Sequence, residues 1–121
     1  MIIFIQARLN SKRLPGKVLM EIEGKKILGW IVERIKKSDI NIPVVVLTSD
    51  KKSDDRIEEF CIKNDINVFR GELDNVIQRF IDAAAFYKQD EFFRLCADSP
   101  CFDPILLKSA LYLAEKNPEY D

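Results

Sequence analysis

The stretch "IIFIQARLNSKRLPGK", residues 2–17, joins an apolar segment to a strongly basic one. The run Ile2–Ala7 is almost continuously apolar, which is typical of a strand buried on both faces of a parallel sheet. Four cations follow it within a single loop: Arg8, Lys12, Arg13 and Lys17. Because like charges repel one another, we expect an anion from outside the chain to compensate them.

The composition favours a small anion over a long nucleic acid as the partner of this loop. The chain has 121 residues, of which 32% are charged and 47% hydrophobic, as in one globular domain covering 1–121. Its 19 basic and 20 acidic residues give a formal net charge of −1. A nearly neutral chain lacks the bulk positive charge with which proteins hold long nucleic acids. We therefore expect no nucleic-acid partner.

The cysteines point to a reducing compartment. Cys61, Cys96 and Cys101 are odd in number and form no CxxC pair, so we expect free thiols and a cytoplasmic protein. Cys61 and Cys96 are interpreted as small buried hydrophobic residues. A metal or redox site at Cys96 and Cys101 is disfavoured, because no histidine is present to complete a ligand set. We expect neither a signal peptide nor a membrane-spanning segment.

Apolar runs and helical repeats alternate along the rest of the chain. Three more strands are expected at Pro43–Thr48, Asn67–Arg70 and Glu91–Ala97. Four helices are expected from apolar residues at helical spacing. The first has the apolar face Ile27, Ile31, Val32 and Ile35. The second begins at Asp54, with Ser53 as its cap, and has the apolar face Ile57, Phe60, Cys61 and Ile62. The third spans Leu73–Tyr87, with Val76, Ile77, Phe80, Ile81 and Ala84 facing inward, and the last starts at Pro104, with Asp103 as its cap. This alternation predicts an α/β fold with a mostly parallel sheet and no internal linker.

The loops that follow the strands hold most of the polar residues that could do chemistry. They are residues 8–17, 48–53, 70–74 and 98–103. Ligands of parallel α/β sheets bind outside the carboxyl ends of the strands, so these four loops should meet at one edge. The basic loop is therefore expected to lie in a ligand crevice.

The side chains of the basic loop suit a phosphate chain. Arg8 and Arg13 can form forked hydrogen bonds to phosphate, and Lys17 adds a point charge. Gly16 permits a backbone turn that other residues resist, and exposed backbone N–H groups there can bind phosphate oxygens. The loop is neither a Walker P-loop nor a dinucleotide fingerprint, because both glycine patterns are missing. On charge spacing alone, a solvated loop explains the sequence equally well.

Asp98 is the second candidate, in the stretch "RLCADSP" directly after the last expected strand. A carboxylate in that place could hold Mg²⁺, which would bridge to phosphate. The alternative is an Asx turn or a helix-entry residue. Asp103 is better explained as a helix cap and is not included in the metal site.

Four motifs in order resemble the sugar-activating cytidylyltransferases, the family that includes the CMP-sialic acid and CMP-Kdo synthetases. They are "QARLNSKRLPGKVL" (6–19), "VVVLTSD" (44–50), "VFRGELDNVIQRF" (68–80) and "FRLCADSPCFDP" (93–104). The first motif is specific, and the other three support it collectively. Within the family, the chain is most similar to the branch of spore coat polysaccharide biosynthesis cytidylyltransferases.

The resemblance implies a Rossmann-like nucleotidyltransferase fold, a three-layer sandwich, and a nucleotide site. It implies that Gln6 and Ala7 shape the nucleotide pocket, and that Arg8, Ser11, Arg13, Gly16 and Lys17 form the triphosphate loop. It gives Arg8 and Lys17 catalytic roles. Arg70 would approach the nucleotide on the side of its base, and residues 48–50 would border the pocket. Asp98 would hold a divalent metal, and Arg79 matches a recurring basic position without a clear role.

The implied reaction is attack by a sugar hydroxyl or sugar phosphate on the α-phosphorus of CTP, with release of pyrophosphate. Mg²⁺ and Lys17 would neutralise the charge that grows on the leaving group. The implied partners are CTP and a sugar, an acidic sugar or a surface-polysaccharide precursor, and the protein would be a homodimer.

Members of this family are about twice as long as this chain. Their later half supplies more sheet, the sugar pocket, a second acidic metal ligand and a dimerisation arm. Since "NPEYD" (117–121) reads as a helix exit at Tyr120–Asp121, we expect a truncated product that lacks these parts. Four side chains would then be exposed and favour self-association: Phe92, Phe93, Leu111 and Leu113.

Three other functions remain open from the sequence. The chain could be a nucleotide-binding or regulatory fragment without catalysis. It could belong to an enzyme that transfers uridylyl or guanylyl groups, because a few pocket contacts decide the base. A flavodoxin-like or receiver domain fits less well, because it would need acidic residues where Arg8 stands.

Overall fold

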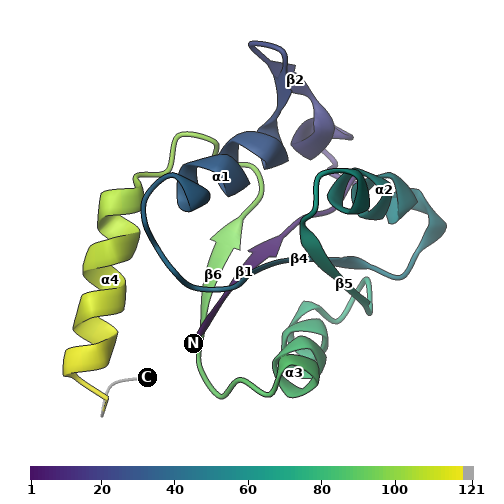
Figure 1. Cartoon of the computed structure of the whole chain (residues 1–121). Helices are drawn as coiled ribbons and strands as arrows, with labels where there is room; N and C mark the ends of the chain where they lie inside the picture. Colours follow the sequence, from purple (N-terminus) through teal and green to yellow (C-terminus); the bar gives the residue numbers. More distant parts are fainter. Residues whose placement is uncertain (119–121) are drawn as a thin grey trace.

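The computed structural model describes residues 1–118, in which a parallel sheet carries helices on both faces (Figure 1). The helix exit expected at Tyr120–Asp121 lies outside the described residues. The strands of the main sheet are β1 (Ile2–Gln6), β4 (Val44–Ser49), β5 (Asn67–Gly71) and β6 (Phe92–Cys96). The helices are α1 (Ile27–Lys36), α2 (Asp55–Lys63), α3 (Val76–Tyr87) and α4 (Pro104–Lys116). The expected α/β class is confirmed.

The main sheet reverses its strand order at β1. Its order is β5-β4-β1-β6, and every neighbouring pair is parallel. The chain therefore moves from β1 through β4 to β5 in one direction, and then crosses back to place β6 on the other side of β1. Ligands of such sheets bind in the crevice where the order reverses. The fold thus points to the carboxyl ends of β1 and β6.

Two apolar clusters define a three-layer arrangement around the sheet (Figure 1). On one face, Ile3 and Ile5 of β1 belong to a core shared with α1, α2 and α4. On the other face, Ile2 and Phe4 pack with Phe80 of α3. The side chains of β1 alternate between the two clusters, so this strand is buried from both sides as its apolar sequence indicated.

Phe4 stands at the centre of an aromatic group under α3. Its ring centroid lies 6.0 Å from that of Phe80, 6.2 Å from that of Tyr87 and 5.1 Å from that of Phe92. Phe80 and Phe92 stack on each other at 5.4 Å. These contacts connect α3 to the sheet across β1 and β6.

Several helix faces were predicted wrongly. Ile62 of α2 and Ile77 of α3 are 70% and 74% exposed, and Ile81 is also exposed. Each expected apolar face is wider than the strip that contacts the sheet, because α2 uses Ile57 and Cys61 and α3 uses Phe80 and Ala83. Helical spacing gives the direction of a buried face but not its width.

The caps of two helices had different outcomes. Asp103 accepts a hydrogen bond from the N–H of Ile105 at 2.8 Å, and Pro104 opens α4, so this cap is confirmed. Ser53 is not a cap, because it lies inside a short 3₁₀ turn, η2 (Lys52–Asp54), and α2 begins one residue later than expected.

The predicted burial of the cysteines is confirmed for Cys61 and wrong for Cys96. Cys61 is buried, and burial together with the charge of Glu58 raises its thiol pKa to about 12. Cys96 was expected to be buried and is exposed, which corrects the prediction. It lies on the edge strand β6, on the face opposite Phe93 and Leu95, which pack against the main core.

The outer side of β6 and α4 is only partly covered. Phe92 and Leu113 are exposed as expected, and Phe93 is half-buried. Leu111 is buried instead, because it packs with Leu107 in the main core. Within the described residues, no helix is long and apolar enough to cross a membrane.

A small hairpin that the sequence did not predict follows the basic loop. It pairs β2 (Glu21–Ile22) with β3 (Lys25–Lys26) through Glu23 and Gly24, which both have positive φ. The strands are two residues long, too short for an alternating pattern to reveal them.

The position of Phe4 gives a prediction for stability. Replacing Phe4 with Ala should lower the free energy of unfolding by about 3–5 kcal/mol, because it removes a fully buried ring and leaves a cavity. Urea unfolding measures this change. Ile77→Ala is the matched control and should stay within about 0.5 kcal/mol, because Ile77 is exposed. A loss at Ile77 comparable with that at Phe4 would contradict the described position of α3.

Candidate functional site

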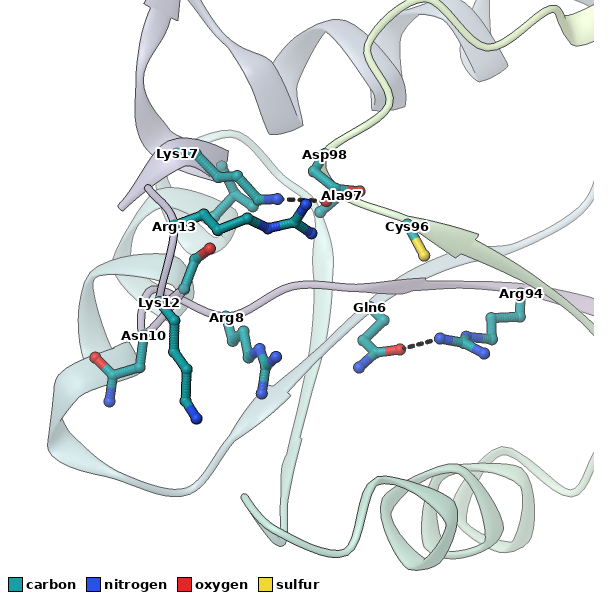
Figure 2. A pocket seen from close by; sticks show the side chains of 12 residues that line it. Gln6, Arg8, Asn10, Lys12, Arg13, Lys17, Arg94, Cys96, Ala97 and Asp98 are labelled. Carbon is teal, nitrogen blue, oxygen red and sulfur yellow. Dashed lines mark hydrogen bonds and ion pairs between the residues drawn. The ribbon is translucent and has the colours of Figure 1, made fainter. Parts of the chain in front are cut away.

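A cavity of about 350 Å³ opens at the carboxyl ends of β1 and β6 (Figure 2). Its walls come from Gln6 and the loop 8–18 on one side, and from residues 94–98 on the other. It therefore lies at the reversal point of the sheet, where the fold predicts a ligand. Within residues 1–118, five cationic side chains line it, Arg8, Lys12, Arg13, Lys17 and Arg94, against the single carboxylate of Asp98.

The basic loop is shaped by its backbone. The carbonyl of Leu9 accepts hydrogen bonds from the N–H groups of Ser11 at 2.9 Å and Gly16 at 2.8 Å, which close the loop on itself. Gly16 has φ +74°, a conformation that glycine adopts without strain. The 3₁₀ turn η1 (Lys17–Leu19) follows and buries Val18 and Leu19 in the core. The backbone that carries the cationic side chains is thus held in place by these hydrogen bonds and apolar contacts.

Lys17 and Asp98 meet inside the cavity, although 81 positions separate them in the sequence. Lys17 Nζ lies 2.5 Å from Asp98 Oδ2, and Arg13 points toward the same carboxylate (Figure 2). The hydrogen bond from Lys17, with the charges of Lys17 and Arg13, lowers the pKa of Asp98 below its usual value. The structure therefore brings together the two groups on which the phosphate-site hypothesis depends.

Most of the residues selected from the sequence line this cavity. They are Gln6, Arg8, Ser11, Arg13, Lys17 and Asp98. Ala7 and Gly16 do not line it and act through the backbone, since the N–H of Ala7 donates to the carbonyl of Leu47 at 2.9 Å. Thr48 and Ser49 are buried below the surface of the sheet edge.

A model of the cytidylyltransferase family matches residues 2–121. The chain belongs to the cytidylyltransferase family.

Individual relatives agree with this assignment. A spore coat polysaccharide biosynthesis protein of Bacillus subtilis is 40% identical over 107 residues, which are 85% of this chain and 45% of that protein. The structure of a cytidylyltransferase from Leptospira borgpetersenii is similar with a TM-score of 0.89 and 42% identity, over 96% of this chain and 49% of that one. The structure of a CMP-2-keto-3-deoxy-manno-octonic acid synthetase in complex with CTP is similar with a TM-score of 0.80 and 25% identity, over 97% of this chain and 48% of that one.

These matches confirm the Rossmann-like cytidylyltransferase fold. The chain spans about half the length of the curated relatives it matches.

Arg70 of this cytidylyltransferase chain does not line the cavity. Its guanidinium forms ion pairs with Asp55 and Glu58 of α2, both at 2.7 Å. It also donates to the carbonyls of Ser49 and Lys51, both at 2.9 Å. Arg70 thus connects β5 to α2 and to the turn after β4. A nucleotide contact by Arg70 would require these bonds to open.

Arg94 lines the cavity and was not selected from the sequence. Its Nη2 donates to Gln6 Oε1 at 2.8 Å (Figure 2). Its guanidinium lies 5.8 Å from the ring centroid of Phe80. A usable signal was present, because side chains alternate along β6 and Arg94 therefore shares a face with Cys96. Asn10 also lines the cavity and was not selected.

Arg79 is fully buried at the start of α3. Its Nη1 donates to the carbonyl of Glu72 at 3.0 Å, whereas Nε and Nη2 have no hydrogen-bond partner among the described residues. Burial lowers the pKa of Arg79, and the positive charge of Arg8 lowers it further, while Asp54 acts in the opposite direction. A positive charge thus lies buried close to the basic loop.

The Lys17–Asp98 pair gives a prediction for titration. Lys17→Met should raise the pKa of Asp98 toward that of a free aspartate, because the hydrogen bond that lowers it is lost. NMR titration of the Asp98 carboxyl carbon measures this shift. Since the pKa is lowered in the folded chain, the pair contributes stability above the unfolded value and loses it as the pH falls through the folded value. An unchanged pKa in Lys17→Met would show that the pair does not form in solution.

The contacts of Arg70 distinguish its two possible roles. If Arg70 is structural, Arg70→Met should lower the free energy of unfolding by about 1–3 kcal/mol and leave nucleotide affinity unchanged. Urea unfolding and calorimetric titration measure the two quantities. Arg56→Met, on the exposed side of the same helix α2, is the control and should alter neither. Weaker nucleotide binding with unchanged stability would instead support the nucleotide contact.

Proposed function

We propose that this chain forms the nucleotide-binding part of an enzyme that transfers CMP from CTP to a sugar and releases pyrophosphate. The observation that carries the proposal is the meeting of Lys17 and Asp98 in one cavity with Arg8 and Arg13. The family assignment and the relative whose structure holds CTP support CTP as the nucleotide. The names of two relatives, a polysaccharide biosynthesis protein and a sugar-acid synthetase, support a sugar acceptor.

In this proposal the triphosphate lies along the basic loop. Arg8 and Arg13 donate forked hydrogen bonds to phosphate oxygens, and Ser11 adds a hydroxyl donor. Among the backbone hydrogen bonds of residues 1–118, none is donated by the N–H groups of Lys12 or Arg13. These amides are therefore available to an anion, as in other loops that bind phosphate through the backbone. The excess of positive over negative side chains in the cavity matches a ligand with several negative charges.

The residues present fit a magnesium ion that is shared with the nucleotide. Mg²⁺ is commonly held by one or two carboxylates together with substrate phosphates, and Asp98 supplies one carboxylate in the cavity. The described residues hold no cluster of three or more candidate ligands, so a site built from this part of the chain alone is not proposed. When bound there, the metal would neutralise charge on the phosphate oxygens.

Lys17 would then change partners. Its ammonium donates to Asp98 in the structure. A cation on Asp98 would release Lys17 toward the phosphate chain, where it can stabilise the leaving pyrophosphate. The acceptor oxygen forms a bond to the α-phosphorus, the bond from that phosphorus to the bridging oxygen breaks, and pyrophosphate leaves with the electron pair. The proton of an acceptor hydroxyl passes to solvent.

We also propose that the part of the relatives that this chain does not match completes the acceptor site and forms the interface of a homodimer. The side chains exposed on α4 and β6, including Leu106, Leu113 and Phe92, suit burial against further structure.

A second candidate function for the isolated chain is nucleotide binding without turnover. The span of about half of its relatives favours this candidate as a description of the 121-residue chain alone.

A nucleotide panel tests the proposed function. CTP with Mg²⁺ should raise the melting temperature of the chain, and UTP and GTP should raise it less. Lys17→Ala should weaken CTP binding about tenfold or more, because a hydrogen bond to a charged group contributes about 1.5–3 kcal/mol. Lys52→Ala is the matched control. It removes a lysine side chain that does not line the cavity, so this variant should bind CTP like the wild type. Equal stabilisation by all three nucleotides would refute CTP selectivity, and no stabilisation by any would refute the nucleotide site.

A further inference from the structure

Asp54 is a buried carboxylate that the proposed reaction does not use. Its side chain is 0% exposed and forms no ion pair within the described residues. Taking a carboxylate out of water is costly unless donors replace the lost hydration. Two neutral donors do so here, and one of them belongs to the basic loop.

The two oxygens of Asp54 join distant parts of the chain. Oδ1 accepts the backbone N–H of Leu9 at 2.8 Å, across 45 positions of sequence. Oδ2 accepts the hydroxyl of Ser49, at the end of β4, at 2.5 Å. A weaker exposed contact runs beside them, from Asn10 Nδ2 to Ser53 Oγ at 3.3 Å. Asp54 therefore fixes the start of the basic loop to the turn that follows β4.

The usual role of an aspartate in this place does not explain these bonds. Asp54 occupies the N-cap position of α2, yet its side chain makes no capping hydrogen bond there. An aspartate at that position normally accepts from backbone N–H groups within its own helix. Here both acceptors are directed away from the helix, toward β4 and the loop.

Leu9 is the residue through which this contact can set the loop geometry. Its N–H is held by Asp54, its carbonyl accepts from Ser11 and Gly16, and its side chain is buried in the core. Arg8 precedes it, and the closed loop that its carbonyl organises leads to Lys17. A displacement of Leu9 would therefore move the cationic side chains relative to Asp98.

We propose that Asp54 is a positioning residue for the phosphate site, acting through the N–H of Leu9. It touches no substrate; it holds the loop in the form in which Arg8, Arg13 and Lys17 face one cavity. Because the ordering of the loop occurs on folding, it is not required again when the nucleotide binds. Two experiments test this inference. The first, called the loop arm, measures the geometry of the loop and rests on the structure alone. The second, called the affinity arm, measures CTP binding and rests on the proposed function.

The loop arm is read from the Leu9 amide. In the wild-type chain, hydrogen exchange should protect the Leu9 N–H, whereas the N–H of Lys12, which has no backbone partner in the described part of the chain, should exchange freely. Asp54→Ala should lower Leu9 protection at least about tenfold and shift the amide resonances of residues 9–17. A wild-type Leu9 amide that exchanges as fast as that of Lys12 would overturn the proposal.

The affinity arm uses three variants. Asp54→Ala should bind CTP about tenfold more weakly, which corresponds to about 1.4 kcal/mol. Asp54→Asn should stay within about threefold of wild type, because an amide oxygen can still accept from Leu9 and its NH₂ can donate to Ser49. Ile57→Ala is the stability control, since Ile57 is equally buried on α2 but belongs to the core; it should lose stability and keep its CTP affinity.

The outcomes separate the possible failures. If Asp54→Ala binds CTP as well as Ile57→Ala does, or if Asp54→Asn loses as much affinity as Asp54→Ala, the positioning role is refuted. If Asp54→Ala does not fold, Ser49→Ala decides, because it removes the partner of Oδ2. Ser49→Ala should lower both the protection of the Leu9 amide and the affinity for CTP. If either quantity stays at its wild-type value, the proposal is overturned. If the wild-type chain does not bind CTP at all, the proposed function fails, while Leu9 exchange still tests the loop.

Discussion

The parallel pairing of β1 with β6 is the constraint on which the rest of the site depends. It aligns Ile2 with Phe92 and Gln6 with Cys96, and the N–H of Ala97 continues the ladder to the carbonyl of Gln6 at 3.0 Å. Where that ladder ends, the chain leaves both strands in the same direction. The loop after β1 and Asp98 after β6 therefore open onto the same cavity. A shift of register by one residue would turn Arg94 and Cys96 to the other face of the sheet.

The electrostatics of the loop follow from this arrangement. Its backbone is held by hydrogen bonds to the carbonyl of Leu9 and to the carboxylate of Asp54, and by burial of Val18 and Leu19. The shape of the loop therefore does not depend on ion pairs of Arg8, Lys12 or Arg13. In the described part of the chain, Lys17 is the only cation of the cavity with an ion-pair partner, and that partner is the carboxylate proposed to hold a metal. The cations of the loop therefore repel one another in the folded chain, and an anionic ligand would relieve this repulsion.

The sequence was sufficient for the strands, for the parallel class of the sheet and for six of the twelve residues that line the cavity, because each of these depends on local patterns. A continuous apolar run indicates a strand buried on both faces, and the residues directly after such strands fall at the ligand edge. It was not sufficient for Arg70. This residue lies near the carboxyl end of β5, but its side chain pairs with Asp55 and Glu58 of α2 and does not line the cavity. Which neighbour a long side chain chooses is a property of packing between elements. The same holds for Ile77, whose exposure depends on which strip of α3 contacts the sheet, and for Cys96, which lies on the edge strand β6.

Asp54 shows why a residue of this kind is hard to find from sequence. Beside Ser53 and Asp55 at a helix start, an acid is expected to cap the helix or to favour its positive end. Its oxygens instead serve a backbone amide 45 positions earlier, and a backbone amide carries no residue-specific signal. The proposed phosphate site thus has two parts, and only one of them can be found from the sequence. The side chains proposed to face the ligand form a motif, whereas the contacts that hold the loop in place arise only once the strands have brought β1 and β4 side by side. Because a preorganised site needs both, the motif alone describes the proposed ligand contacts and not the structure that keeps them in position.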